Sequence, residues 1–191
     1  MKVVAFNGSP RKDGNTAHLV QHVFQELKNE GIETELVNIA AAPVRGCRAC
    51  YHCFETHNGR CGIQNDIVND CITKMLAADG IILASPTYFA NVTAEMKALI
   101  DRAGLVAKAN DQHFRRKVGA AVVAVRRGGE MQTFNALNSF FLISEMIVPG
   151  SCYWNMGFGL EEGQVEKDEE GVRTMHILGQ NMAWLLKKIH G

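Results

Sequence analysis

The sequence predicts an α/β fold, a three-layer, doubly wound parallel sheet of five strands. Short apolar runs alternate along the 191 residues with segments whose apolar positions recur at helical spacing. One run, residues 118–125, is apolar throughout, as expected of a strand buried on both faces at the centre of a parallel sheet. The chain shows no internal repeat and no low-complexity segment. We therefore expect residues 1–191 to form a single domain.

The elements follow in order. A β-branched run at residues 2–6 stops at Asn7-Gly8 and predicts the first strand. Apolar residues at 19, 20, 23, 24 and 27 then form a helical stripe that Gly31 ends. Residues 32–39 alternate between apolar and polar, which predicts a strand partly open on one side. Residues 43–65 show no period and form a loop long enough to suggest a function.

The second part of the chain continues the alternation. Met96, Leu99, Ile100 and Ala103 mark a helix through their i, i+3, i+4 and i+7 spacing. We expect the other helices at residues 67–76, 131–146 and 173–189, and the remaining strands at residues 80–85, 118–125 and 147–154. Residues 157–171 are rich in glycine and acidic side chains, and we interpret them as a solvated surface loop.

The charge balance restricts the partners. The 20 Lys and Arg equal the 20 Asp and Glu, and no long basic run exists to neutralise a nucleic-acid backbone. The longest apolar stretch is too short to span a bilayer, and the N-terminus lacks the apolar core of a signal peptide. We expect a cytoplasmic protein that binds neither nucleic acid nor membrane. In a reducing compartment its six cysteines serve as ligands, redox groups or core residues.

The loop after the first strand has the composition of an anion site. Between Gly8 and Thr16 it offers small residues, hydroxyls and an amide at a helix N-terminus, where the helix dipole favours negative charge. Arg11 adds a guanidinium suited to phosphate oxygens. The glycine spacing matches neither a dinucleotide fingerprint nor a P-loop, which favours a single terminal phosphate. An ordinary capped turn remains the alternative.

Two further loops follow strands that end at the same edge of the sheet. Pro86-Thr87-Tyr88-Phe89 with Asn91 offers a flat apolar face bordered by hydrogen-bonding groups, which suits a ring system with polar edges. Alternatively, Tyr88 and Phe89 pack in the core or in a subunit interface. After the central strand, Arg126-Arg127-Gly128-Gly129 allows either a close backbone approach to a ligand or a sharp turn. The coincidence of the three loops predicts a ligand site.

Four cysteines are spaced Cys47-x2-Cys50-x2-Cys53-x7-Cys61. Two successive C-x2-C steps present three thiolates on one side of a loop, and a fourth completes the ligands of a [4Fe–4S] cluster. A zinc site, with or without His52 or His57, and free or redox-active thiols are the alternatives. Cys71 and Cys152 lie apart and are expected to pack in the core. His18 and His22, at i and i+4, are interpreted as helix-surface histidines without a third metal ligand.

The sequence resembles the flavodoxin-like NAD(P)H-dependent FMN reductases, and in particular their iron–sulfur flavoprotein branch. The resemblance rests on four motifs and extends over nearly the whole chain. They are Asn7-Gly8-Ser9-Pro10-Arg11 with Gly14-Asn15-Thr16, Ser85-Pro86-Thr87-Tyr88-Phe89, Lys97-Ala98-Leu99-Ile100-Asp101-Arg102, and Arg127-Gly128-Gly129. No proline follows the fourth cysteine, where Gly62 stands, and this departure weakens a ferredoxin-domain interpretation more than a flavoprotein one.

The resemblance implies a strand order of 2-1-3-4-5 and a bound FMN. Ser9, Arg11, Asn15 and Thr16 would hold its phosphate. The flavin would be lined by Pro86, Thr87, Tyr88, Phe89 and Asn91 and approached by Gly128 and Gly129, with Arg127 near its edge. The helix containing Leu99 to Arg102 would contribute to a homodimer or homotetramer.

The resemblance leads to two functional hypotheses. In the first, an FMN-dependent oxidoreductase takes electrons from NAD(P)H or a reduced ferredoxin-like protein and passes them to a flavin, quinone or metal complex, with no catalytic side chain required. In the second, a non-enzymatic carrier relays electrons through FMN and a cluster between protein partners. A zinc-stabilised interaction module is a weaker third hypothesis.

Overall fold

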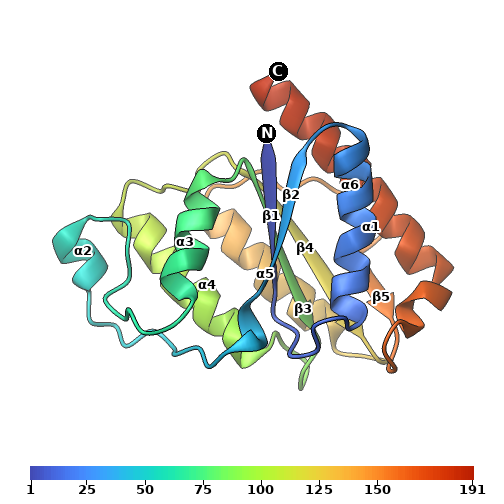
Figure 1. Ribbon diagram of the computed structural model, residues 1–191, viewed down its shortest axis with the longest axis horizontal. Coiled ribbons are helices and arrows are strands. Elements are labelled where there is room, and N and C mark those ends of the chain that lie inside the picture. The colour runs from blue at the N-terminus through green and yellow to red at the C-terminus, as the bar shows by residue number, and fades with distance from the viewer.

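The computed structural model describes residues 1–191 and contains one five-stranded parallel sheet (Figure 1). The strand order is β2-β1-β3-β4-β5, which confirms the 2-1-3-4-5 order expected. The strands are β1 (Lys2–Asn7), β2 (Glu33–Asn38), β3 (Gly80–Pro86), β4 (Val118–Val125) and β5 (Met156–Phe158). Every pairing is parallel, with Val4 opposite Ile81 and Leu83 opposite Ala121.

Helices cover both faces of the sheet. The longer ones are α1 (Asn15–Asn29), α3 (Val68–Ala77), α4 (Ala94–Ala109), α5 (Glu130–Ile143) and α6 (Glu169–His190); the short ones are α2 (His52–Thr56), η1 (Ile39–Ala41) and η2 (Gln164–Lys167). Helices α3, α4 and α5 bury their apolar sides against one face in a cluster that includes Phe6, Leu83 and Phe141. Helices α1 and α6 cover the other face, where Leu19 and Leu178 pack in one cluster with Ile82 of β3. The three-layer expectation is confirmed.

The alternation of side chains along each strand explains the two cores. Val4 and Phe6 point to the α3–α4–α5 side, whereas Val3 and Ala5 point to the α1–α6 side. All eight residues of β4 are buried, as its uninterrupted apolar sequence predicted. Burial of apolar area on both faces is the main driving force for this architecture.

The prediction for the last strand was wrong. Residues 147–154 make only an isolated bridge between Ile147 and Val118, whereas the fifth strand of the sheet is β5, paired with Val123–Val125. Pro149 lacks a backbone N–H group and cannot donate to a ladder, and Gly150 weakens a strand. The short β5 was missed because three residues are too few to establish a period.

The prediction of a solvated loop at residues 157–171 was wrong in part: Glu161, Glu162 and Glu170 are exposed, but the segment is not an irregular loop throughout. The segment contains most of β5 and all of η2, and Val165 is fully buried. A Cβ at Gly157 would lie 2.6 Å from Val165 and 2.7 Å from Leu19, so only glycine permits this close packing on α1. Glu166 contacts His18 Nδ1 at 2.8 Å and His22 Nε2 at 2.9 Å, so the two histidines of α1 anchor the segment to the helix.

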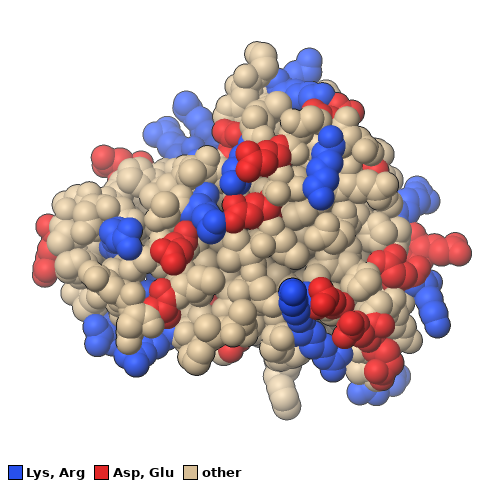
Figure 2. All heavy atoms as spheres, in the orientation of Figure 1, with Lys and Arg blue, Asp and Glu red and all other residues tan.

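The charged side chains of the surface are mixed, as the equal numbers of acidic and basic residues predict. On the face that Figure 2 shows, Lys and Arg are interspersed with Asp and Glu.

No helix combines the length and the apolarity needed to cross a membrane.

Candidate functional site

Residues from all three predicted loops meet at the carboxyl edge of the sheet. They line a cavity of about 130 Å³, to which the first loop contributes Ser9, Arg11, Asn15 and Thr16. The second loop contributes Pro86, Thr87 and Tyr88. The ends of β4 and β5 complete the lining with Ala124, Val125, Arg126, Gly159 and Leu160. Seven of the twelve predicted residues therefore surround one cavity.

The first loop forms a cradle of free backbone donors at the start of α1. The N–H groups of Lys12, Asp13, Asn15 and Thr16 donate to no acceptor within the protein. Ser9 Oγ accepts from the Arg11 N–H at 3.2 Å, and Asn7 Oδ1 accepts from the Ser9 N–H at 2.9 Å, which fixes the turn. Free N–H groups and a helix N-terminus together favour an anion.

Two of the residues predicted to bind the phosphate, Arg11 and Asn15, also hydrogen-bond the segment that follows β5. Asn15 Nδ2 donates to Glu161 O at 2.9 Å, and Asn15 Oδ1 accepts from Val165 N at 3.2 Å. Arg11 Nη1 donates to Leu160 O at 3.1 Å, but its side chain stays exposed at the cavity. The Asn15 amide therefore closes the loop over the cradle. Sequence reasoning missed Gly159 and Leu160 because nothing in their sequence signals a ligand.

The second loop is a tight turn whose tip lies in solvent. Tyr88 and Asn91 exchange backbone hydrogen bonds of 2.9 and 3.1 Å, and Phe89 and Ala90 between them have positive φ. The Phe89 side chain is fully exposed and that of Tyr88 is about half exposed, so neither packs in the core of this chain. Non-glycine residues at positive φ are uncommon and are often retained at functional sites.

An unpartnered hydroxyl lies in the same turn. Thr87 Oγ1 is buried and makes no hydrogen bond within the protein, although the Thr87 N–H donates to Ala124 O at 2.9 Å. A buried polar atom without a partner costs about 1–3 kcal/mol. Because Thr87 lines the cavity, a bound ligand is the natural partner for this hydroxyl.

The third loop contributes differently from the prediction. Arg126 lines the cavity, whereas Arg127, Gly128 and Gly129 do not. Gly129 has a φ of +90°, and a Cβ there would lie 2.9 Å from Ala90 Cα and 3.3 Å from Thr87 Cγ2. Gly129 therefore supports the Thr87–Ala90 turn from behind. Arg126 follows β4 directly, and its place in the strand alternation was the signal that could have identified it.

The four clustered cysteines surround a second, very small cavity. Cys47, Cys50, Cys53 and Cys61 line it together, with a volume of about 10 Å³. All four are free thiols; Cys47 and Cys50 are exposed, Cys53 and Cys61 buried. Neither His52 nor His57 lines this cavity, and His57 Nδ1 instead lies 2.6 Å from Ala109 O on α4. No three Cys, His, Asp or Glu side chains converge closely enough to hold one metal ion.

The cysteine loop has an unusual backbone. Ala49, Tyr51 and His57 adopt positive φ, although none is glycine, and they flank Cys50 and the short helix α2. Left-handed residues reverse the chain locally, and Ala49 N–H donates to Cys47 Sγ at 3.4 Å. The sequence predicted a loop here without α2, because five residues give no helical period.

The remaining cysteines differ from each other. Burial raises the pKa of the Cys71 thiol to about 12, so Cys71 is a packing residue as predicted. Cys152 is exposed, and the prediction that it packs in the core was wrong because it lies in the irregular segment before β5. Burial also raises the pKa of Cys53, against its backbone hydrogen bonds, and nearby Cys61 and Cys47 raise it further. These three thiols therefore share one electrostatic environment.

The α4 motif divides between two roles. Leu99 and Arg102 are about 1% exposed and point into this chain's own interior, so they cannot pack against a second copy. Their neighbours Ile100 and Asp101 line a groove of about 540 Å³ between α4 and α5. Any contribution of α4 to an oligomer would come from this groove.

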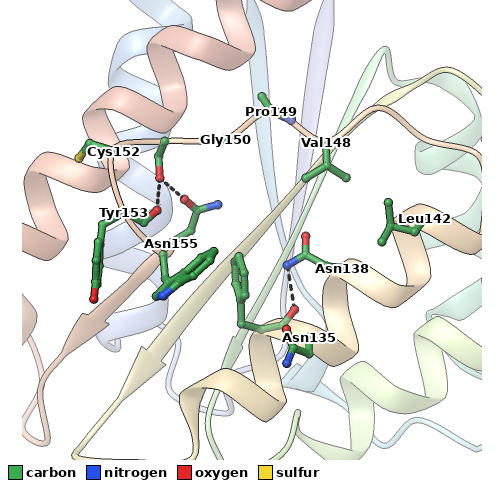
Figure 3. A pocket seen from close by; sticks show the side chains of 12 residues that line it. Asn135, Asn138, Leu142, Val148, Pro149, Gly150, Cys152, Tyr153 and Asn155 are labelled. Carbon is green, nitrogen blue, oxygen red and sulfur yellow. Dashed lines mark hydrogen bonds between the residues drawn. The ribbon is translucent and has the colours of Figure 1, made fainter.

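The largest cavity lies elsewhere. It has a volume of about 610 Å³ and lies between α5 and residues 148–155 (Figure 3). Asn135, Asn138 and Leu142 of α5 face Val148, Tyr153 and Asn155. No charged residue lines it, so it offers nothing to neutralise a phosphate. The small cavity at the sheet edge is the better candidate because donors and charges meet there.

The chain is similar to known proteins over its full length. A family model described as NADPH-dependent FMN reductase matches residues 1–161. The chain is 40% identical to an iron-sulfur flavoprotein of Methanocaldococcus jannaschii, with 99% of both chains covered. It is 34% identical to an iron-sulfur flavoprotein of Methanosarcina thermophila, with 99% of this chain and 97% of that one covered.

The fold has counterparts among solved structures. The flavodoxin, WrbA-like protein from Agrobacterium tumefaciens matches with a TM-score of 0.66 and 16% identity, over 98% of this chain and 97% of that one. This likeness concerns the fold alone and confirms that it is flavodoxin-like.

Proposed function

The chain belongs to the NADPH-dependent FMN reductase family, and from this premise we propose that it holds FMN at the carboxyl edge of its sheet. Family membership makes flavin-based oxidoreduction its general chemistry. The observation that carries the proposal is the cradle of four free N–H groups beside the unpartnered Thr87 hydroxyl. The cradle and Arg11 suit a phosphate, and the Thr87 hydroxyl suits a polar group of the same ligand.

The residues that line the cavity indicate what the protein would contribute and what FMN would contribute. When bound, FMN supplies the hydride and electron chemistry, so the chain needs no nucleophile or general acid. Ser9, Arg11, Thr16 and the free N–H groups would bind the phosphate, and Asn15 would keep the Gly159–Leu160 segment closed over it. Arg126 adds a second cation at the cavity, whereas Arg127, which the resemblance places near the edge of the flavin, does not line it. The exposed Tyr88 and Phe89 and the neighbouring Asn91, Gly128 and Gly129 remain proposed flavin contacts.

We further propose that Cys47, Cys50, Cys53 and Cys61 hold a [4Fe–4S] cluster. The thiols line one cavity, and in a cubane each thiolate binds its own iron, so the sulfurs need not converge on one point. A single zinc ion would require such convergence, and neither histidine lines the cavity.

The proposed activity is electron transfer from NAD(P)H or a ferredoxin-like donor to a small acceptor, such as a flavin, quinone or metal complex, in a cytoplasmic homodimer or homotetramer. The alternative is a non-enzymatic carrier that relays electrons through FMN and a cluster between protein partners; the name iron-sulfur flavoprotein, which the relatives bear, includes both kinds of centre. Anaerobic mixing with NADPH, NADH or reduced ferredoxin, followed by addition of a quinone or free flavin, distinguishes the two. Bleaching of the bound flavin by ferredoxin but by neither nicotinamide, without reoxidation by the small acceptor, would support the carrier.

Removal of the Arg11 guanidinium should weaken FMN binding about tenfold or more. A hydrogen bond to a charged group contributes about 1.5–3 kcal/mol, and about 1.4 kcal/mol is tenfold in affinity. The measurement is flavin fluorescence titration of the Arg11→Ala apoprotein with FMN and with riboflavin, which lacks the phosphate. Riboflavin affinity should be unchanged. Lys12→Ala, which removes an exposed cation from the same loop, is the control. Equal weakening for both ligands would contradict a phosphate role.

The cysteine proposal is tested by metal analysis. We expect about four irons per chain and no zinc after anaerobic purification, since a [4Fe–4S] cluster contains four irons. Cys61→Ser should lose most of the iron, whereas Cys71→Ser, which changes a buried packing thiol, should retain it. A flavin spectrum without iron would rule out the cluster while leaving the FMN proposal intact.

A further inference from the structure

Arg102 is the only charged residue that is buried when main chain and side chain are counted together. It projects from α4, is about 1% exposed, and lies at the cysteine cavity. A buried ion pair is often no more stabilising than well-packed apolar residues of similar volume. Stability alone therefore gives little reason for a guanidinium at this position.

The guanidinium joins both ends of the cysteine loop. Nη1 donates to Arg45 O at 3.0 Å and to Asp66 Oδ2 at 2.5 Å, and Nη2 donates to Ile63 O at 2.9 Å. Arg45 precedes Cys47, and Ile63 and Asp66 follow Cys61. One side chain thus fixes the loop on either side of the four cysteines.

The fourth hydrogen bond of the Arg102 guanidinium goes to a cysteine sulfur. Nε donates to Cys61 Sγ at 3.2 Å, while the Cys61 backbone is fixed separately by Asn69. Asn69 Oδ1 accepts from Cys61 N at 2.8 Å, and Asn69 Nδ2 donates to Cys61 O at 3.0 Å. The main chain and the sulfur of Cys61 therefore have independent partners, which places this thiol more rigidly than the exposed Cys47 and Cys50.

The guanidinium of an arginine is protonated throughout the working range of proteins, so the Arg102 Nε–H that reaches Cys61 Sγ is a charged donor. A charged donor makes a stronger hydrogen bond than a neutral one. Hydrogen bonds to cysteine sulfurs are among the features that set the reduction potential of an iron–sulfur cluster. Such a bond, particularly from a cation, stabilises the more negative, reduced form.

We propose that Arg102 is a positioning residue that holds Cys61 for the cluster and, through its Nε–H to Cys61 Sγ, raises the cluster's reduction potential. This inference rests on the proposed cluster and adds a determinant of the potential. Asp66 orients the guanidinium, since their ion pair has almost no solvent access.

The test is a potentiometric titration of the anaerobic holoprotein, in which dithionite supplies the single electron that takes the cluster from its 2+ to its 1+ state. Arg102→Lys keeps a cation for Asp66, but its one nitrogen cannot serve four acceptors. Monitored by the paramagnetism of the reduced cluster, the ratio of reduced to oxidised cluster at fixed potential should fall about tenfold, equal to 59 mV for one electron. Arg48→Lys, at an exposed arginine beside the same cysteines, should titrate like the wild type.

The outcomes separate the proposals. An iron-free wild type would overturn the cluster and this inference together. A wild type that contains iron and an Arg102→Lys variant with an unchanged potential would overturn this inference alone. A folded variant that keeps FMN but loses its iron would support the positioning role. If Arg102→Lys does not fold, Arg102→Gln, which retains N–H donors without charge, is titrated instead, and an unshifted potential there also overturns the inference.

Discussion

Replacement of Asp66 by alanine should lower the free energy of unfolding by about 3–5 kcal/mol, because it leaves the buried Arg102 charge without its counterion. The Asp66 and Arg102 side chains are about 1% and 0% exposed, so water cannot replace the lost carboxylate. Arg45 N and Val68 N also lose their side-chain acceptor. Urea unfolding of the apoprotein measures the loss.

The matched control for Asp66→Ala is Asp101→Ala. Asp101 pairs with Lys97 at i and i+4 on α4, and both side chains are about half exposed. Such surface pairs contribute about 0.3–0.5 kcal/mol. An Asp66→Ala variant within about 1 kcal/mol of this control would mean that the buried pair contributes no more than a surface pair.

The same pair predicts a pH dependence. Burial would raise the pKa of Asp66, but hydrogen bonds from Arg102, Arg45 N–H and Val68 N–H outweigh it and hold the pKa below the ordinary 3.8. The stability from this carboxylate is therefore complete above the unfolded-state pKa and is lost as the pH falls through the lower, folded-state pKa. Between pH 6 and pH 2.5, the difference in unfolding free energy between wild type and Asp66→Ala should shrink at the acid end.

Gly129→Ala should affect both folding and the flavin site. The residue's φ of +90° disfavours any side chain, which costs about 1–3 kcal/mol, and the new Cβ would crowd Ala90 at a comparable cost. Because the added methyl also reaches Thr87, we expect at least a tenfold loss of FMN affinity in the variant that still folds. Urea unfolding and flavin titration measure the two effects.

Gly128→Ala is the control for Gly129→Ala, since nothing lies within 4 Å of a Cβ at Gly128. It should leave the free energy of unfolding close to that of the wild type. If Gly129→Ala binds FMN like the wild type despite a lower stability, the turn that Gly129 supports does not hold the flavin.

The sequence was sufficient for the fold where long-range burial imposed a clear period. The eight-residue β4 was predicted to the residue, and α1 and α4 were identified from their apolar stripes. The sequence failed to predict elements that are too short to show a period and that depend on tertiary contacts. Strand β5 has three residues, and its existence depends on pairing with β4 and on Gly157 fitting against Leu19, which no local pattern records.

The candidate site shows the same division. Residues next to strand ends, such as Ser9 and Thr87, were accessible from sequence because topology brings strand ends together. Leu160 was not, because it reaches the cavity only through hydrogen bonds of Arg11 and Asn15 to its own segment. The resemblance placed Arg102 on a helix that contacts a second subunit. Its side chain is instead buried within this chain, because Asp66 provides a buried counterion that no local sequence pattern reveals.

The cavity at the sheet edge is lined by residues as far apart in the sequence as Ser9 and Leu160. It forms only when the loops after the first and the last strand are both in their folded positions. A ligand that recognises this cavity is therefore thermodynamically linked to folding of the whole molecule, and at one hundred times its dissociation constant it adds about 2.7 kcal/mol to global stability. Residues 159–165, which Asn15 holds over the cavity, should open first when the ligand dissociates. Hydrogen exchange of their backbone amides should therefore report whether the site is occupied.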